Sequence, residues 1–278
     1  MDAAYWRAVA DDGFRLPHDR PLDQLTVELV EMLGSPDPQV RDGLAYPTLG
    51  TWVERGVYDD LLPGLGDGMA SGLMVGIGDV ASDGVFRRSF SALVLAECLQ
   101  RDQTVDRLVG EQVLEWGDRL IGWLLRERDV RGYVPGKGWA HAVAHGADAI
   151  GVLAGSRHLE APELTALLDV IADRVLLPTP PLTHGDPDRL AGAALAVLDR
   201  DLVPLDVVER WVGRVGAAAD SYAGSKQDDP FSTTFNPQQL LRALSLQLQL
   251  RTPAPPHRAD LLLTVADALR STNAPFVS

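Results

Sequence analysis

The sequence predicts an all-α fold, an α-solenoid of stacked helix pairs. Apolar residues recur at the helical spacing of about 3.6 residues along most of the chain, and the strict alternation of a β-strand is almost absent. Ala, Leu, Arg and Glu outnumber β-branched and aromatic residues in these periodic segments. The chain has 278 residues, 46% of them hydrophobic, which is long enough and apolar enough for a substantial core. We therefore expect one α-helical repeat domain over residues 1–278.

Clusters of proline and glycine separate the expected helices, because both residues interrupt helical hydrogen bonding. In chain order the clusters are SPDP (35–38), LLPGLGDG (61–68), GYVPGKG (132–138), LLPTPPLTHGDPD (176–188) and RTPAPPHR (251–258). Between them the periodicity predicts about eleven helices. These cover 21–33, 38–55, 68–78, 84–100, 104–127, 139–155, 161–176, 187–199, 204–222, 236–250 and 257–271. The polar segment 220–237 is long for a connection and is interpreted as a candidate lid.

Several expected helices share a pattern that indicates a repeat. An Asp-containing turn precedes Arg41, Arg88 and Arg189, and each arginine is followed at four-residue steps by small or aliphatic residues. His145 begins the same spacing, so the four positions lie 47, 57 and 44 residues apart. Periods of roughly 40–47 residues are typical of HEAT and armadillo arrays, in which helix pairs stack to cover each other's apolar faces. The pattern favours a HEAT-like solenoid over a globular helical bundle.

Composition limits the classes of partner. The formal net charge of −14 argues against nucleic acid and against anionic membrane surfaces, because both are bound by basic surfaces. A protein, a peptide or a small-molecule ligand stays open, and we expect no cofactor. Cys98 is the only cysteine and lies in an apolar helical segment, which predicts a buried structural thiol. The N-terminal residues are acidic where a signal peptide needs basic ones, so we expect a soluble cytoplasmic protein.

Four motifs resemble successive blocks of one bacterial protein family. They are RDGLAYPTLGTWV (41–53), FRRSFSALVL (86–95), ERDVRGYVPGKGWAHAVAHGADAI (127–150) and GDPDRLAGAAL (185–195). The family is catalogued as domain of unknown function 2785, and the third motif is long and specific. The resemblance implies a single-domain, soluble, helical bacterial protein, and it transfers no reaction and no catalytic residue. The chain departs mildly from it at residues 185–187, where family members often carry an acidic Gly-Glu-Asp type of turn.

His141, His145 and Asp148 are the most distinctive candidate site residues. They follow one another at i, i+4 and i+7, so a helix would place them on one face. Two His at this spacing can bind one metal ion, as in His-Glu-x-x-His zinc enzymes, but the intervening residues 142–144 lack the glutamate that acts as base there. The favoured interpretation is hydrogen bonding within the fold. Ligand recognition or acid–base chemistry comes next, and a metal site is favoured least.

Four basic residues, Arg87, Arg88, Arg131 and Lys137, lie before or on the first turns of expected helices. Cations are unfavourable at a helix N-terminus, so each needs a compensating partner. One interpretation is an ion pair with a turn aspartate such as Asp42, Asp83 or Asp186. The other is a pocket for a carboxylate or phosphate. The ion pair is favoured for Arg88, and for Arg131 and Lys137 both interpretations stay open.

These observations favour a HEAT-like binding module that recognises a peptide, a partner protein or a small anionic ligand. Its pocket is expected around Arg131, Lys137, Trp139 and His141, although core packing is the favoured role for Trp139 itself. The full set of ligand-binding candidates is Arg87, Arg88, Arg131, Lys137, Trp139, His141, His145 and Asp148. The alternative is an enzyme that uses the His141/His145/Asp148 face as acid–base groups or metal ligands. No catalytic residue is assigned.

Overall fold

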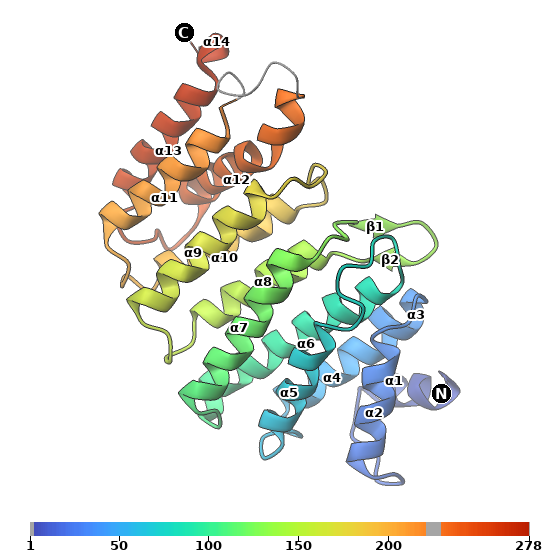
Figure 1. The fold of residues 1–278 in the computed structure, drawn as a ribbon. Helices are drawn as coiled ribbons and strands as arrows, with labels where there is room; N and C mark the ends of the chain where they lie inside the picture. Colours follow the sequence, from blue (N-terminus) through green and yellow to red (C-terminus); the bar gives the residue numbers. More distant parts are fainter. Residues whose placement is uncertain (1–2, 221–228, 278) are drawn as a thin grey trace. The chain divides into compact units, whose positions relative to one another are not determined.

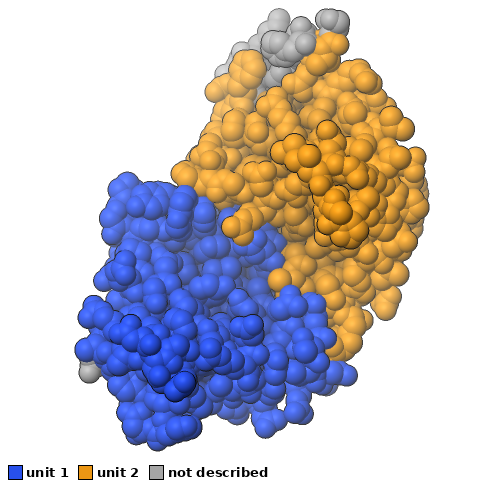
Figure 2. Space-filling model, turned by 180° about the vertical axis from the view of Figure 1, so that it is seen from behind, with its two compact units in different colours: residues 1–149 blue, residues 150–278 orange. Residues whose placement is uncertain are grey.

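A computed structural model describes residues 3–220 and 229–277, and the described chain is almost entirely helical (Figure 1). It divides into two compact units, residues 1–149 and 150–278, which Figure 2 distinguishes by colour. The all-α fold class is confirmed. The single repeat domain and the solenoid arrangement stay predictions, and each unit is described by itself below.

The N-terminal unit is built from helices that pack on their neighbours in the chain. Its elements are α1 (Ala3–Asp11), α2 (Leu22–Met32), α3 (Pro38–Val40), η1 (Arg41–Ala45), α4 (Tyr46–Glu54), α5 (Leu62–Gly72), α6 (Gly84–Val105), α7 (Gly110–Arg126), β1 (Tyr133–Val134), β2 (Gly138–Trp139) and the first turns of α8 (Ala142–Ala154). Helix α2 packs on α4, α4 packs on α6, and α5 packs on both α6 and α7. The resulting core buries four tryptophans completely, namely Trp6, Trp52, Trp116 and Trp123.

The element η1 is a π-helix, and the proline that follows it accounts for the wide turn. Pro47 has no N–H to bond the carbonyl four residues earlier, and its ring crowds that carbonyl. The backbone instead widens over Arg41–Ala45, where the N–H of Tyr46 donates to the carbonyl of Arg41. Wide turns of this kind are frequent at functional sites. Here the turn precedes α4 and begins with the buried Arg41.

The C-terminal unit contains the rest of α8 and the helices α9 (Ala161–Leu176), α10 (Asp186–Leu198), α11 (Leu205–Ala218), α12 (Pro230–Leu250), α13 (Arg258–Thr272) and α14 (Ala274–Val277). Helix α9 contacts α10, α11 and α12, and α13 packs against α11 and α12. Glu160 and Glu163 form a reciprocal capping box that fixes the start of α9. The helices expected over 161–176, 187–199, 204–222 and 257–271 agree with the structure to within a few residues.

Other elements differ from expectation for identifiable reasons. The structure has a helix α1 over Ala3–Asp11 that the periodicity did not indicate. Helix α5 begins at Leu62 instead of residue 68, because Pro63 is tolerated in a first helical turn. Helix α12 begins at Pro230, capped by the Asp229 side chain, although Pro237 lies inside it. Of the candidate lid 220–237, residues 221–228 lie outside the described residues.

Two further features of the described chain bear on function. Cys98 is buried as expected, and burial raises the pKa of its thiol. A buried neutral thiol is a poor nucleophile, which agrees with a packing role. Within residues 3–220 and 229–277, no helix has both the length and the apolar character needed to cross a lipid bilayer.

Candidate functional site

Residues 131–141 form a short β-hairpin, here called hairpin 131–141, where the sequence predicted a loop followed by a helix. Strands β1 and β2 pair antiparallel, with Tyr133 opposite Trp139. The N–H of Lys137 donates to the carbonyl of Val134 across Pro135 and Gly136, whose φ is +76°. This is the pattern of a type II turn, which needs a left-handed residue at its third position. Helix α8 consequently begins at Ala142 rather than at residue 139.

Two cations attach this hairpin to the turn before α6. The ammonium of Lys137 lies 2.6 Å and 2.9 Å from the two carboxylate oxygens of Asp83. The guanidinium of Arg131 donates to the Asp129 carboxylate at 2.6 Å and 2.8 Å and to the carbonyl of Ser82 at 2.8 Å. An acidic side chain therefore matches each of these cations, as the ion-pair interpretation describes.

Arg41 supports the hairpin from beneath. Its side chain is fully buried, and its guanidinium donates to the carbonyl of Ser35 at 2.7 Å and to the carbonyl of Lys137 at 2.8 Å. The same group lies 4.1 Å from the centroid of the Phe86 ring and 2.9 Å from Asp42. Burial lowers the pKa of Arg41, and the neighbouring Asp42 acts in the opposite direction. The contact with Lys137 links residues that are 96 positions apart, so it fixes the hairpin on the helical scaffold.

Arg88 and Arg87 have different surroundings. Arg88 is fully buried and pairs with Glu127, with 2.5 Å between Nε and Oε2. It also donates to the carbonyls of Val75 and Gly76, both at 3.0 Å. Arg87 is half-buried, and burial lowers the pKa of its guanidinium. Among the described residues, Arg87 makes no hydrogen bond and no ion pair. The structure thus gives Arg88 a partner within the fold.

An aromatic row leads from the hairpin into the core. Tyr133 and Trp139 meet edge to face with ring centroids 5.0 Å apart, and Trp139 stacks on His141 at 4.2 Å. The rings continue inward in the order His141, His145, Phe90 and Tyr46. Their successive ring centroids lie 5.6, 5.2 and 6.0 Å apart. Tyr133 is 52% exposed and Trp139 is 43% exposed, whereas Phe90 is 3% exposed. The row therefore leads from two exposed rings, through the half-buried histidines, to the buried Phe90.

The Ser89 hydroxyl fixes the orientation of the His145 ring. Ser89 Oγ donates its single proton to the carbonyl of Ala140 and lies 2.8 Å from Nδ1 of His145. Because the carbonyl can only accept, His145 must donate from Nδ1 to Ser89. Ser89 is fully buried, and its proton is directed away from the imidazole. The pair therefore holds His145 in place and lacks the arrangement of a nucleophile with its base.

His145 and Asp148 lie three residues apart on α8 and so share one face of it as predicted, whereas His141 lies outside the helix. His141 precedes α8 and has φ of +48°, although its carbonyl accepts the first helical bond, from the N–H of His145. Asp148 lies on α8, where its charge contributes to raising the pKa of Tyr46. Burial is the larger cause of that shift, followed by Glu97, which accepts a hydrogen bond from the Tyr46 hydroxyl at 2.9 Å. Among residues 3–220 and 229–277, no group of three or more His, Cys, Asp or Glu side chains is placed to hold a metal ion.

The structure thus brings five of the predicted residues together around the hairpin, namely Arg131, Lys137, Trp139, His141 and His145. Sequence reasoning missed Tyr133, Ser89 and Phe90. The segment VPGK at 134–137 was the available signal for Tyr133, because Pro-Gly at the centre of a turn predicts a hairpin that pairs its flanking residues. Ser89 and Phe90 carried no signal, since only the packing of α6 against hairpin 131–141 gives them a role.

Comparison with known proteins identifies one relationship. A family model described as protein of unknown function (DUF2785) matches residues 73–246, which include hairpin 131–141. No curated protein and no solved structure matches the chain.

Proposed function

The chain belongs to the DUF2785 family, and from its candidate site we propose that it is a binding module that recognises a partner polypeptide through hairpin 131–141. The observation that carries this proposal is the pair of exposed rings, Tyr133 and Trp139, held edge to face at 5.0 Å on an anchored hairpin. Tyrosine and tryptophan dominate the energetics of protein–protein interfaces.

The rigidity of the hairpin supports this role. Trp139 is stacked on His141, and the hairpin base is held by Arg41, Arg131 and Lys137. A partner that covers these rings would meet a surface that is already ordered, so little conformational entropy would be lost on binding. Aromatic side chains also supply large contact areas with few rotatable bonds.

The charge distribution favours a polypeptide over a small anion. Asp83 neutralises Lys137, and Asp129 neutralises Arg131, so an anionic ligand would compete with carboxylates already in contact. The formal net charge of −14 would further repel such a ligand. A neutral or basic peptide segment that packs on the aromatic rings meets neither obstacle.

A selection from a random peptide library tests the proposal. We expect peptides that enrich on the wild-type protein to bind the Trp139→Ala variant at least tenfold more weakly, which corresponds to about 1.4 kcal/mol. Tyr133→Ala is expected to weaken the same peptides to a smaller degree. Isothermal titration calorimetry measures both, with thermal unfolding to show that the variants fold.

Phe231→Ala is the matched control, because Phe231 is also an exposed aromatic residue, 70% accessible, but lies on α12. This variant should bind the selected peptides like the wild type. Peptides that bind Trp139→Ala and the wild type equally well would show that the hairpin is not the recognition site.

The enzyme alternative rests on His145, whose ring is oriented by the contact of its Nδ1 with Ser89. It has weaker support, because Ser89 directs its proton to the carbonyl of Ala140 and not to the imidazole. Incubation of each selected peptide with the protein, followed by mass spectrometry, tests it. A product formed by the wild type and absent with His145→Gln would favour catalysis over simple binding.

We also propose that the helix pairs form a HEAT-like repeat and that the protein acts in the cytoplasm. Three of the four repeat positions support the first point, since Arg41, Arg88 and His145 each lie near the start of a helix and bond another segment. Arg189 is exposed, whereas Arg41 and Arg88 are buried. A single buried cysteine is compatible with a reducing compartment.

A further inference from the structure

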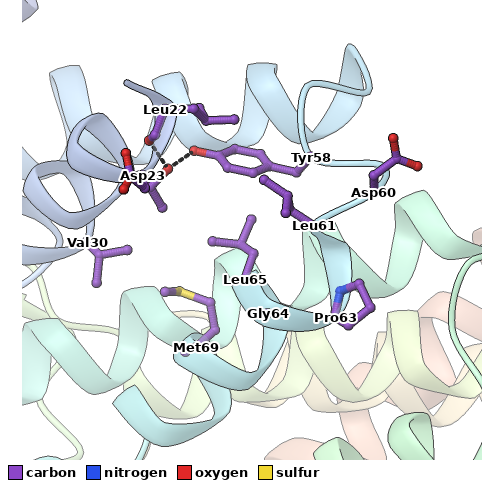
Figure 3. Close-up of a pocket in the computed structure, with 12 residues that line it drawn as sticks. Leu22, Asp23, Val30, Tyr58, Asp60, Leu61, Pro63, Gly64, Leu65 and Met69 are labelled. Carbon is purple, nitrogen blue, oxygen red and sulfur yellow. Dashed lines mark hydrogen bonds between the residues drawn. The ribbon is translucent and has the colours of Figure 1, made fainter. Parts of the chain in front are cut away.

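A cavity of about 400 Å³ lies between α2 and α5 in the N-terminal unit (Figure 3). Its lining comes from one face of α2, the turn after α4 and the first half of α5. Small-molecule sites in proteins typically have volumes of roughly 300–1,000 Å³ and mostly apolar walls. This cavity meets both conditions, and it lies apart in the chain from hairpin 131–141. We propose that it binds a small molecule with an apolar body and a cationic ammonium head group.

The walls explain the apolar body. They are formed mainly by aliphatic and thioether side chains, namely Val30, Leu61, Leu65 and Met69. Leu61 is 55% exposed, whereas Leu65 and Met69 are buried, so the surface runs from the solvent to the helix core. A ligand that covers these side chains would gain about 25 cal/mol for each Å² of apolar surface removed from water.

The hydrogen bonds at one end explain the head group. Thr26 Oγ donates to the carbonyl of Leu22 at 2.7 Å, and the hydroxyl of Tyr58 lies 2.7 Å from the same Oγ. Because Thr26 has only one proton, Tyr58 must donate to Thr26. The Tyr58 oxygen then keeps only acceptor positions for a ligand (Figure 3). A ligand group that reaches the Tyr58 oxygen must therefore be a hydrogen-bond donor.

The charges around the cavity favour a positively charged donor. Asp23 precedes Thr26 by one helical turn, and Asp60 lies at the end of the turn that carries Tyr58. Both residues are part of the lining, and no described residue of the lining is basic. The Asp60 carboxylate is exposed and lies 3.6 Å from Arg107, whereas Asp23 has no ion pair among residues 3–220 and 229–277 and accepts one hydrogen bond, from the N–H of Gln24 at 2.8 Å. An ammonium group satisfies both the acceptor-only hydroxyl and the negative charge.

The glycines of α5 fall into two groups. At Gly66 a Cβ atom would lie 2.0 Å from the Trp116 ring, and at Gly72 it would lie 2.3 Å from Ser91 Oγ, so packing requires both glycines. At Gly64 and Gly68 a Cβ would meet nothing within 4 Å, and both residues line the cavity. Glycine inside a helix is less favourable than alanine by about 1 kcal/mol. At Gly64 and Gly68 a side chain can therefore be added without a clash, which makes these positions suitable for testing the cavity.

Titration calorimetry with three eight-carbon probes tests the assignment. We expect octylammonium to bind the wild-type protein, octanol to bind more weakly, and octanoate to bind at least tenfold more weakly than octylammonium, because its charge faces Asp23. Asp23→Asn should weaken octylammonium about tenfold and leave octanol unchanged. Equal binding of octanoate and octylammonium would overturn the head-group assignment.

Gly68→Leu tests the location, because the new side chain fills the cavity without contacting the fold within 4 Å of its Cβ. It should abolish octylammonium binding while the melting temperature stays equal or rises. Gly213→Leu on α11 is the matched control, since its Cβ is equally unobstructed, and it should bind octylammonium like the wild type. Unchanged binding by Gly68→Leu, or no saturable binding by the wild type, would refute the proposal. Binding of a basic amphipathic peptide without binding of octylammonium would refute it too, because the occupant would then be a polypeptide.

Discussion

Arg88 on α6 and Glu127 at the end of α7 form an ion pair in which neither side chain is exposed to solvent. Glu127 also accepts a hydrogen bond from the indole of Trp123 at 3.0 Å and one from the N–H of Asp129 at 3.0 Å. The pair therefore joins the two helices and fixes the backbone that leads into hairpin 131–141. Arg88, which the sequence suggested as a ligand-binding candidate, therefore has a structural partner inside the protein.

Loss of the cation from this pair is expected to be strongly destabilising. Arg88→Met should lower the free energy of unfolding by about 3–5 kcal/mol, because it leaves the Glu127 carboxylate buried without a counter-charge. The double variant Arg88→Met/Glu127→Leu should recover a large part of that loss. Urea denaturation measures both variants, and a single variant as stable as the wild type would contradict the buried pair.

The exposed pair of Lys137 and Asp83 should behave differently. Both side chains are about two-fifths accessible to solvent, and such pairs contribute roughly 0–1 kcal/mol. Lys137→Met should therefore change the free energy of unfolding by less than about 1 kcal/mol. The same urea experiment checks this, and the small effect should shrink further at high salt.

Two glycines of the hairpin offer a matched comparison of crowding. Gly136 and Gly138 both have positive φ, so alanine at either position is strained by about 1–2 kcal/mol. Only at Gly138 would the Cβ also lie 3.1 Å from the Arg41 guanidinium and 3.1 Å from Pro38. Gly138→Ala should therefore destabilise the protein more than Gly136→Ala in thermal unfolding. Equal losses would show that Arg41 does not support the hairpin.

Tyr58 predicts a specific sensitivity to alkaline pH. Burial raises its pKa from 10.0 to about 12. As the pH rises through 10, the unfolded chain loses a proton that the folded chain keeps, so the free energy of unfolding falls until the pH reaches about 12. Tyr58→Phe should remove this part of the pH dependence. Urea denaturation at a series of pH values tests it, and parallel curves for the two proteins would contradict the shift.

The sequence predicted most helices because proline, glycine and Asp-containing turns mark their ends. Asp37 caps α3 as such a turn predicts, with its carboxylate accepting from the N–H of Gln39 at 2.9 Å. Prediction from the sequence failed where tertiary contacts outweigh the local preference for a helix or a turn. The glycines of LLPGLGDG lie inside α5, because Gly66 lets Trp116 pack against the helix, and no local rule indicates that contact.

The candidate site was predictable in composition and less so in geometry. The density of charged and aromatic residues singled out 131–150, and the structure stacks Trp139 on His141 there. The roles of the cations depended on residues far along the chain, such as Asp83 for Lys137 and Ser35 for Arg41. Arg87 and Arg88 are adjacent in sequence but have different surroundings, which the helical periodicity of the sequence does not distinguish. The α2–α5 cavity had no motif at all, and it lies outside the family-matched range 73–246.

The attachments that hold hairpin 131–141 to Arg41 and to the turn before α6 precede it in the chain. Its partners at Ser82, Asp83 and Arg41 are synthesised 49 to 96 residues before the atoms they hold. During synthesis from the N-terminus, the surface that receives the hairpin can be assembled before the hairpin leaves the ribosome. The aromatic rings would then pass directly from the exit tunnel to their docked position. This order of assembly would shorten the time for which Arg131 and Lys137 are without their partners in the fold.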